Sequence, residues 1–137
     1  MEMETTEIID FGVIKPEGET NDRIRETIRH CITLCRTNEV TFVFIEGIQI
    51  QRNPRVYEVL AKLQGSLEIL LEEKGYFVNV VKAPEWRRRV GIKNKKRDLV
   101  KAEAHALVKE LYQLEPTEDE CEAILFARAF AQEGPNT

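Results

Sequence analysis

Two short apolar runs separated by one amphipathic segment constrain the fold of this chain more than any other feature. The runs are "EVTFVFIE", residues 39–46, and "YFVNVVKA", residues 76–83, and both are rich in β-branched and aromatic residues. The segment between them, 54–74, begins at Pro54, ends before Gly75 and has the apolar spacing of a helix. The residues that we expect on its buried stripe are Val56, Leu60, Leu63, Leu67 and Leu70. Strand, helix and strand with short joins predict a parallel pair, and uniformly apolar strands are typical of α/β sheets that are covered on both faces.

The flanking segments predict one more strand and several helices. The segment "TEIIDFGVIKP", residues 6–16, stops at a Pro and is expected to form a strand followed by a turn. Helices are expected over 21–36, over a short turn around Trp86, over 97–114 and from Thr117 onward. The buried residues expected on the first and third of these helices are Ile24, Ile28, Cys31, Ile32 and Cys35, and Leu99, Ala102, Ala106, Leu107 and Leu111. Thr117 and Glu120 stand in the capping-box relation, which marks the start of the last helix.

The length of 137 residues fits one domain, residues 1–137, with a frayed tail at about 132–137. No apolar run approaches the roughly 18 residues that a membrane span needs, and the acidic start "MEMETTE" does not resemble a secretory signal. We therefore expect a cytoplasmic protein that does not enter the membrane. Cys31, Cys35 and Cys121 are expected to be free thiols, because a zinc site would need further Cys or His residues at close spacing.

The net charge of −4 hides a strong asymmetry along the chain. Residues 82–101, which we call the basic segment, hold nine basic and two acidic residues and carry +7, whereas the rest of the chain carries −11. A concentrated positive zone on an acidic protein favours a polyanion such as nucleic acid, because Lys and Arg displace counterions from phosphates. A solvated surface laced with ion pairs is the alternative.

Three carboxylates raise a second possibility. Glu46 ends an apolar strand, where an ionised side chain is costly unless a cation meets it. Asp119 and Glu122 are three apart, so they project from one side of the last helix, which also carries Ala123, Phe126 and Phe130. Each acid has a structural alternative, since Arg52 or Arg55 can pair with Glu46 and the helix dipole favours acids in a first turn. Brought together, the three would form an oxygen-rich site for Mg²⁺ or Mn²⁺, the ions used in phosphodiester cleavage.

Several stretches together resemble one protein family. "FGVIKPEGETNDRI", the span from "VFIEGIQIQRNPRVYEVL" through "APEWRRRVGIKNKKRD", and "TEDECEAILFARAF" are similar to the RuvC family of Holliday junction resolvases, over residues 8–130. The resemblance implies a ribonuclease H-like α/β fold, in which helices flank a mixed sheet. It also implies a homodimer that uses Mg²⁺ to nick four-way DNA junctions in recombination and repair. It assigns metal binding and catalysis to Glu46, Asp119 and Glu122, although the position of Glu122 more often holds Asp.

The sequence departs from the family pattern in two places. The family begins with a β-hairpin whose first strand carries a catalytic Asp, and no residues here match it. Asp10 aligns with the family's third strand, outside the metal site. The expected fold is therefore a ribonuclease H-like sheet with its amino-terminal strands truncated. Some family members also place an aromatic residue after the strand-end Glu, where this chain has Gly47, Ile48 and Gln49.

Three functions stay open on the sequence. The first is a metal-dependent endonuclease for branched DNA, and the second is a non-catalytic remnant that binds junctions or dimerises without competent metal chemistry. The third is an interaction module whose basic segment contacts a protein. The first two predict DNA contacts from Gln49, Gln51, Arg52, Arg87, Arg88, Lys93, Lys95, Lys96 and Arg97. Exposed apolar positions on the helix 54–74 are expected to pack against a symmetric mate.

Overall fold

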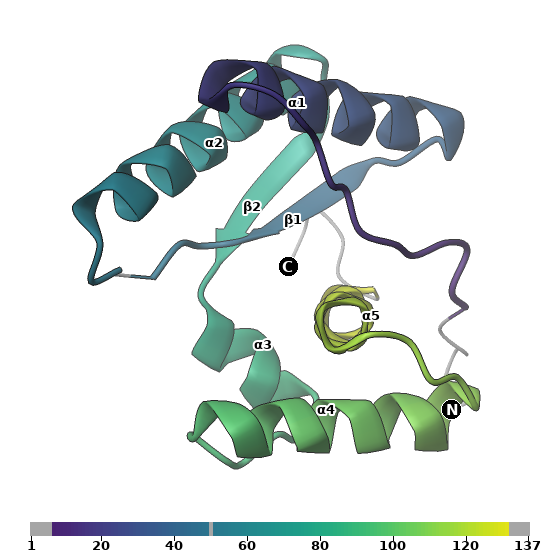
Figure 1. Cartoon of the computed structure of the whole chain (residues 1–137). Helices are drawn as coiled ribbons and strands as arrows, with labels where there is room; N and C mark the ends of the chain where they lie inside the picture. Colours follow the sequence, from purple (N-terminus) through teal and green to yellow (C-terminus); the bar gives the residue numbers. More distant parts are fainter. Residues whose placement is uncertain (1–6, 50, 132–137) are drawn as a thin grey trace. The chain divides into compact units, whose positions relative to one another are not determined.

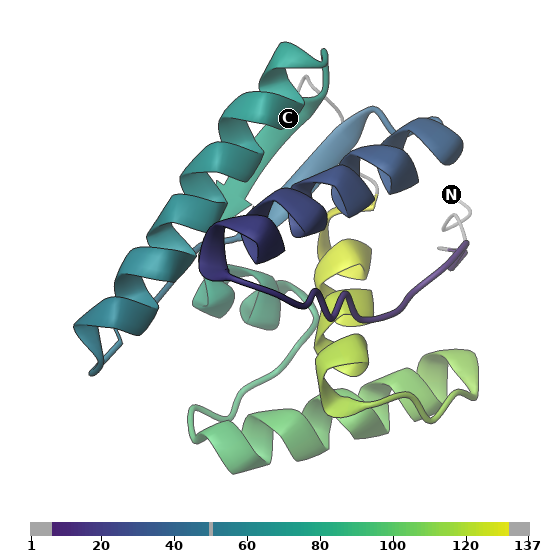
Figure 2. The ribbon, with the colours of Figure 1, turned by 45° about the horizontal axis from the view of Figure 1, so that its top comes forward.

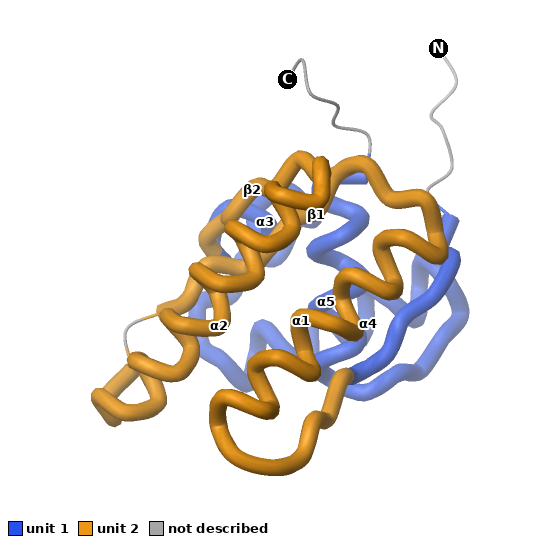
Figure 3. Tube along the Cα trace, turned by 90° about the horizontal axis from the view of Figure 1, so that it is seen from above, with its two compact units in different colours: residues 1–13, 83–137 blue, residues 14–82 orange. Residues whose placement is uncertain are grey.

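The computed structural model describes residues 7–49 and 51–131, which contain two strands and five helices (Figure 1). In chain order these are α1 (Thr20–Thr37), β1 (Phe42–Glu46), α2 (Pro54–Glu73), β2 (Phe77–Val81), α3 (Ala83–Arg89), α4 (Arg97–Tyr112) and α5 (Glu118–Phe130). The chain divides into two compact units, which Figure 3 distinguishes by colour. We call residues 14–82 the sheet unit and residues 1–13 with 83–137 the helical unit. The expectation of one domain stays a prediction, and the tail expected at 132–137 lies outside the described residues.

The strand pair of the sheet unit confirms the main prediction from the sequence. β1 and β2 are parallel and joined by α2, with Phe42 opposite Phe77 and Glu46 opposite Val81. The rings of Phe42 and Phe77 stack with their centroids 5.5 Å apart. The ladder continues at both ends, since Phe77 N–H donates to the Thr41 carbonyl at 3.0 Å and Gly47 N–H donates to the Val81 carbonyl at 2.8 Å.

The expectation that both strands are buried on both faces is wrong. The apolar residues of β1 are half-buried, and in β2 only Val81 is buried. The side chains of Phe77 and Val80 are 54% and 37% exposed. Within the described residues the sheet consists of these two strands. An apolar run indicates that a strand is suited to burial. Whether the strand is buried depends on other elements of the chain that cover its faces.

The expected strand over 6–16 is also not found: residues 7–17 adopt no regular structure, and Thr6 lies outside the described range. The Asp10 carboxylate accepts a hydrogen bond from the adjacent Phe11 N–H at 2.8 Å. Such a local bond occupies a backbone donor that a strand would use in its ladder. Ile9 is 79% exposed and Val13 47%. A strand needs a partner edge, and alternating apolar residues cannot supply one by themselves.

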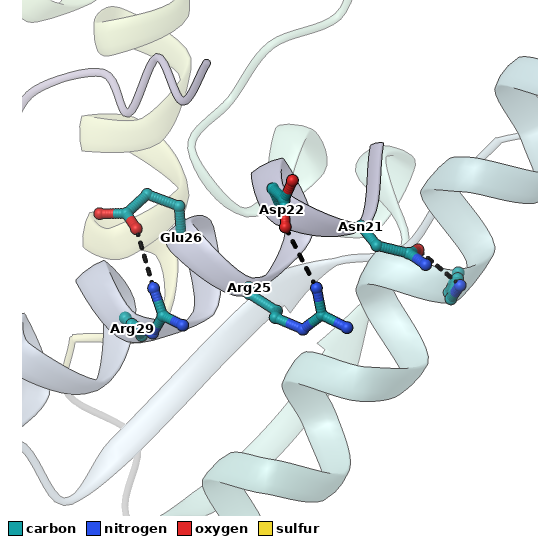
Figure 4. Close-up of polar contacts among 6 residues, drawn as sticks. Asn21, Asp22, Arg25, Glu26 and Arg29 are labelled. Carbon is teal, nitrogen blue, oxygen red and sulfur yellow. Dashed lines mark hydrogen bonds and ion pairs between the residues drawn. The ribbon is translucent and has the colours of Figure 1, made fainter. Parts of the chain in front are cut away.

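α1 and α2 pack against each other on one side of the strand pair (Figures 1 and 2). The predicted stripe of α1 is confirmed, because Ile24, Ile28 and Cys35 are buried and Cys31 and Ile32 are half-buried. The opposite face of α1 carries two ion pairs, each between residues three apart in the sequence. They join Asp22 to Arg25 at 3.2 Å and Glu26 to Arg29 at 3.1 Å (Figure 4). Asn21 Oδ1 accepts a hydrogen bond from Lys62 Nζ on α2 at 2.7 Å, which links the two helices (Figure 4).

The stripe predicted for α2 is only partly right. Leu60, Leu63 and Leu67 are half-buried, but Val56 is 43% exposed and Leu70 is 38% exposed. The fully buried residue is Leu71, at 0% exposure. Leu70 and Leu71 are both apolar, so periodicity alone could not choose between them.

In the helical unit, α5 packs against both α3 and α4. The predicted capping box is present: Thr117 Oγ1 accepts from Glu120 N–H at 3.3 Å, and Glu120 Oε1 accepts from Thr117 N–H at 3.0 Å. The predicted helical turn around Trp86 is α3, and this Trp is fully buried with its ring 5.9 Å from that of Phe126. The buried core of the unit consists of Ala83, Trp86, Ile92, Val100, Ala104, Val108, Cys121, Ile124, Leu125, Phe126 and Phe130.

The buried face predicted for α4 is wrong. Leu99 and Leu111 are 48% and 40% exposed, Ala102 and Ala106 are exposed, and Leu107 is half-buried. The residues that α4 buries are instead Val100, Ala104 and Val108, which are four apart. α4 has apolar residues on more than one side, and the sequence pattern favoured the side with more leucines. None of the helices in the described part of the chain is long and apolar enough to cross a bilayer.

Candidate nucleic-acid interface

Most of the basic segment lies within the helical unit, on α3, on the loop 90–96 and on the first turn of α4. Five of the predicted DNA-binding cations are exposed there: Arg88, Lys93, Lys95, Lys96 and Arg97. Arg87 is half-buried, and its guanidinium lies 5.6 Å from the ring centroid of Trp86. Five of these six cations are therefore exposed, and four of the five follow α3 in the sequence.

Arg89 and Lys101 have structural contacts instead. Arg89 forms an ion pair with Glu85 at 3.3 Å, and its guanidinium lies 4.4 Å from the ring centroid of Phe130. A cation over an aromatic ring adds to packing, so Arg89 helps to fix α3 on α5. Lys101 Nζ pairs with Glu118 at 3.0 Å, which joins α4 to the start of α5.

The chain leaves α3 by a tight, hydrogen-bonded turn. Gly91 N–H donates to the Arg88 carbonyl at 3.1 Å, and Ile92 N–H donates to the Arg87 carbonyl at 2.9 Å. Gly91 has φ +87°, a backbone conformation that glycine adopts without strain. The next side chain, Ile92, is 7% exposed, so the loop 90–96 starts from a buried anchor.

Sequence reasoning missed Glu103, which lies on α4 and contacts this loop. Its Oε2 accepts a hydrogen bond from Lys93 N–H at 3.2 Å, and its Oε1 accepts one from Asn94 Nδ2 at 2.5 Å. No short-range pattern points to this contact, because nine and ten residues separate the partners. Glu103 therefore belongs to the basic surface through its contacts, although its charge is opposite.

The predicted acids of α5 lie at the margin of its buried face. Asp119 is exposed in the first turn, where the helix dipole favours a carboxylate, and Glu122 is half-buried. Phe126 and Phe130 are buried as expected, at 7% and 3% exposure. The expectation that Ala123 shares this burial is wrong, because Ala123 is exposed. The helix buries Cys121, Ile124 and Leu125 instead, which moves its packed face away from Ala123.

The cysteines are free thiols, as predicted. Burial raises the pKa of the Cys35 thiol and of the Cys31 thiol, and Cys35 raises the pKa of Cys31 further. Burial is also the main cause of the raised pKa of Cys121, followed by the negative charges of Glu120, Glu118 and Glu122. Neutral, buried thiols are poor nucleophiles, and this argues against a catalytic role for Cys35 and Cys121.

The other predicted site residues lie in the sheet unit, between β1 and α2. Glu46 is exposed at the end of β1, so the predicted burial cost that called for a cation is absent. Gln49 and Arg52 are exposed and Gln51 is half-buried. Gln64 on α2, which sequence reasoning missed, accepts a hydrogen bond from Ile48 N–H at 2.9 Å and so holds the start of this loop.

Gln51 and Asn53 form two further hydrogen bonds in this connection. Gln51 Nε2 donates to the Gln49 carbonyl at 3.2 Å, and the Asn53 side chain caps α2 by accepting from Arg55 N–H at 2.9 Å. The loop is therefore supported on its α2 side, next to the exposed Arg52.

The acids that the resemblance assigns to a metal ion are divided between the two units. Glu46 belongs to the sheet unit, and Asp119 and Glu122 belong to the helical unit. Within residues 7–49 and 51–131, no three His, Cys, Asp or Glu side chains form a group that could hold a metal ion. The convergence of the three acids stays a prediction.

The fold is similar to two solved RuvC structures. "T. thermophilus RuvC in complex with Holliday junction substrate" matches with a TM-score of 0.65 and 13% sequence identity, over 88% of this chain and 76% of that chain. "Thermus thermophilus RuvC structure" matches with a TM-score of 0.64 and 12% identity, over 87% and 74%. No protein-family model and no curated protein matches the sequence. At this level of identity the comparisons show a RuvC-like fold.

Proposed function

We propose that this chain recognises four-way DNA junctions as a RuvC-like protein of recombination and repair, and that junction-resolving endonuclease is its activity. The single observation that carries the proposal is the similarity, over 88% of the chain, to a RuvC structure in complex with a Holliday junction substrate. The exposed cations of the basic segment support it independently. Phosphate contacts supply most of the affinity of proteins for DNA, and Lys and Arg on an exposed loop are suited to make them.

Junction contacts would come from two surfaces. The first is the basic segment, through Arg88, Lys93, Lys95, Lys96 and Arg97, with the half-buried Arg87 as a further candidate. The second is the connection between β1 and α2, through Gln49, Gln51 and Arg52. Arg and Gln side chains can donate to phosphate oxygens and to base edges, so this second surface suits contacts near the junction centre. A homodimer would present both surfaces twice, which matches the two-fold symmetry of a junction.

The finer fold assignment is part of the same proposal. We assign β1 and β2 to the parallel part of a ribonuclease H-like mixed sheet whose further, amino-terminal strands are not matched in this sequence. The exposed Phe77 and Val80 side chains are suited to lie beneath covering elements of such a sheet.

Cleavage would depend on Mg²⁺ or Mn²⁺ held by Glu46, Asp119 and Glu122. Such an ion would supply a nucleophile at neutral pH and would stabilise the leaving oxygen. The second candidate is a junction-binding or dimerisation protein without metal chemistry. The two candidates share the DNA-binding surface and differ only in whether the bound DNA is nicked.

The experiment that separates them uses one labelled four-way junction and a linear duplex of the same length. We expect tighter binding to the junction than to the duplex without metal, and nicking of the junction when Mn²⁺ is added. A Glu46→Gln variant should bind equally and fail to nick. Binding without nicking in either protein would support the non-catalytic candidate, and equal affinity for junction and duplex would contradict junction recognition.

Binding through the basic segment needs its own matched control. A Lys95→Ala/Lys96→Ala variant should bind the junction more weakly than wild type. A Lys15→Ala/Lys74→Ala variant removes the same charge from two exposed lysines outside the basic segment and should bind nearly as wild type. Equal losses in both variants would show that net charge, rather than this surface, governs affinity.

A further inference from the structure

We infer that Glu103 is a positioning residue for DNA binding, because its carboxylate holds the loop 90–96 in the conformation that presents the neighbouring cations. This inference rests on the proposed function and names a residue that the RuvC resemblance did not assign. Both oxygens of the carboxylate are used, one by the backbone N–H of Lys93 and the other by the side chain of Asn94. Hydrogen bonds to an ionised acceptor are stronger than those between neutral groups.

The contact lies between two other fixed points of the loop. Before it, Ile92 is buried and its N–H is bonded to the Arg87 carbonyl. After it, the first hydrogen bond of α4 runs from Val100 N–H to the Lys96 carbonyl at 2.9 Å. Glu103 fixes the two residues that follow Ile92. The stretch that carries Lys95, Lys96 and Arg97 is therefore short and is held at both ends.

Charge alone would give Glu103 the opposite role. An acid beside a positive surface lowers the local potential and should weaken phosphate binding. A preordered loop has the contrary effect, since cations that are already placed lose less conformational freedom when they bind. The sign of the change on removing Glu103 therefore tells the two roles apart.

Glu110 offers a matched control on the same helix. It lies seven residues after Glu103, is exposed and carries the same charge. Glu103→Ala should weaken affinity for a four-way junction about three- to tenfold at fixed salt, because the loop must then be ordered on binding. Glu110→Ala should leave affinity unchanged or raise it up to about twofold. Junction binding by Glu103→Ala as tight as that by Glu110→Ala would overturn the inference.

A second variant keeps the test informative if Glu103→Ala folds poorly. Asn94→Ala removes one of the two bonds and should give a smaller loss of affinity in a protein with an unchanged melting temperature. No loss in Asn94→Ala, together with a loss in Glu103→Ala that tracks its melting temperature, would assign Glu103 to fold stability instead.

Limited digestion with trypsin measures how accessible the loop 90–96 is to cleavage in the absence of DNA. Trypsin cuts after Lys and Arg, so Glu103→Ala should be cut faster within 93–97 than wild type or Glu110→Ala. Equal cutting rates in all three proteins would contradict the positioning role. If no protein binds the junction but the digestion rates differ as expected, the proposed function is wrong and the positioning of the loop stands.

Discussion

The salt dependence of junction binding is the sharpest consequence of the exposed basic surface. Each phosphate contact releases counterions, so the logarithm of the binding constant falls with the logarithm of salt concentration at a slope of about −0.9 per contact. In the basic segment the structure exposes five candidate cations: Arg88, Lys93, Lys95, Lys96 and Arg97. If each of these meets one phosphate and Arg52 meets a base edge, the slope for one bound chain is about −4.5. Removing Lys95 and Lys96 leaves three contacts and a slope of about −2.7.

These slopes are easily measured. Between 50 and 200 mM salt, the affinity of the wild-type chain should fall about 500-fold, and that of Lys95→Ala/Lys96→Ala about 40-fold. Fluorescence anisotropy of a labelled junction at four or five salt concentrations gives both values. A bound dimer doubles both slopes and leaves their ratio near three fifths, so the ratio tests the surface independently of stoichiometry. A ratio of one would refute the reasoning, because the two lysines would then contact no phosphate.

Three further predictions concern the folded state. Trp86→Ala should lower the free energy of unfolding by about 3–5 kcal/mol, because the side chain is fully buried against Phe126. Chemical denaturation measures this change, and a loss below about 1 kcal/mol would contradict the packing. Thr117→Ala should lower the free energy of unfolding by about 1 kcal/mol in the same assay, because it removes the capping box. An unchanged denaturation midpoint would show that the cap is not formed. Because burial raises the pKa of the Cys35 and Cys121 thiols, each holds less thiolate at about pH 8 than an ordinary cysteine. Iodoacetamide should therefore label them more slowly in the folded than in the unfolded chain, and equal rates would refute their burial.

Local pattern was enough to predict most elements, because short-range rules decide them. The strand pair with its helical connection follows from two apolar runs and one periodic segment, and the capping box follows from two residues three apart. The predicted strand 6–16 failed because pairing depends on an edge elsewhere in the chain. On α4, periodicity left two apolar faces open, and packing against α5 selected Val100, Ala104 and Val108.

The same division applies to the candidate interface. Charge counting located the basic segment, and five of its six predicted DNA-binding cations are exposed in the structure. It could not find Glu103, whose contact crosses a loop, or Gln64, which holds the start of the connection between β1 and α2 from sixteen residues away. It also attributed to Glu46 a burial cost that the exposed side chain does not have. Supporting residues of a site are chosen by three-dimensional proximity, which a single sequence does not contain.

The predicted convergence of Glu46 and Asp119 can be tested without any metal ion. Two carboxylates that share a site repel each other, so removing either charge relieves the same repulsion, and removing both gains less than the sum. A double-mutant cycle of Glu46→Gln and Asp119→Asn in a chelator should therefore give a coupling free energy above about 0.5 kcal/mol by chemical denaturation.

The cycle also removes the local contribution of Asp119 to the α5 dipole, because that term occurs equally in the single and the double variant. The control cycle pairs Glu46→Gln with Glu110→Gln, a helix acid that the metal-site hypothesis does not include. Changes at distant sites add to within about 0.3–0.5 kcal/mol, so this control cycle should show no coupling. Additivity in both cycles would place Glu46 away from Asp119 and leave the DNA-binding surface without a metal centre between the two units. Coupling in the first cycle alone would mean that a strand end and a helix start, 73 positions apart in the sequence, meet as the endonuclease proposal requires.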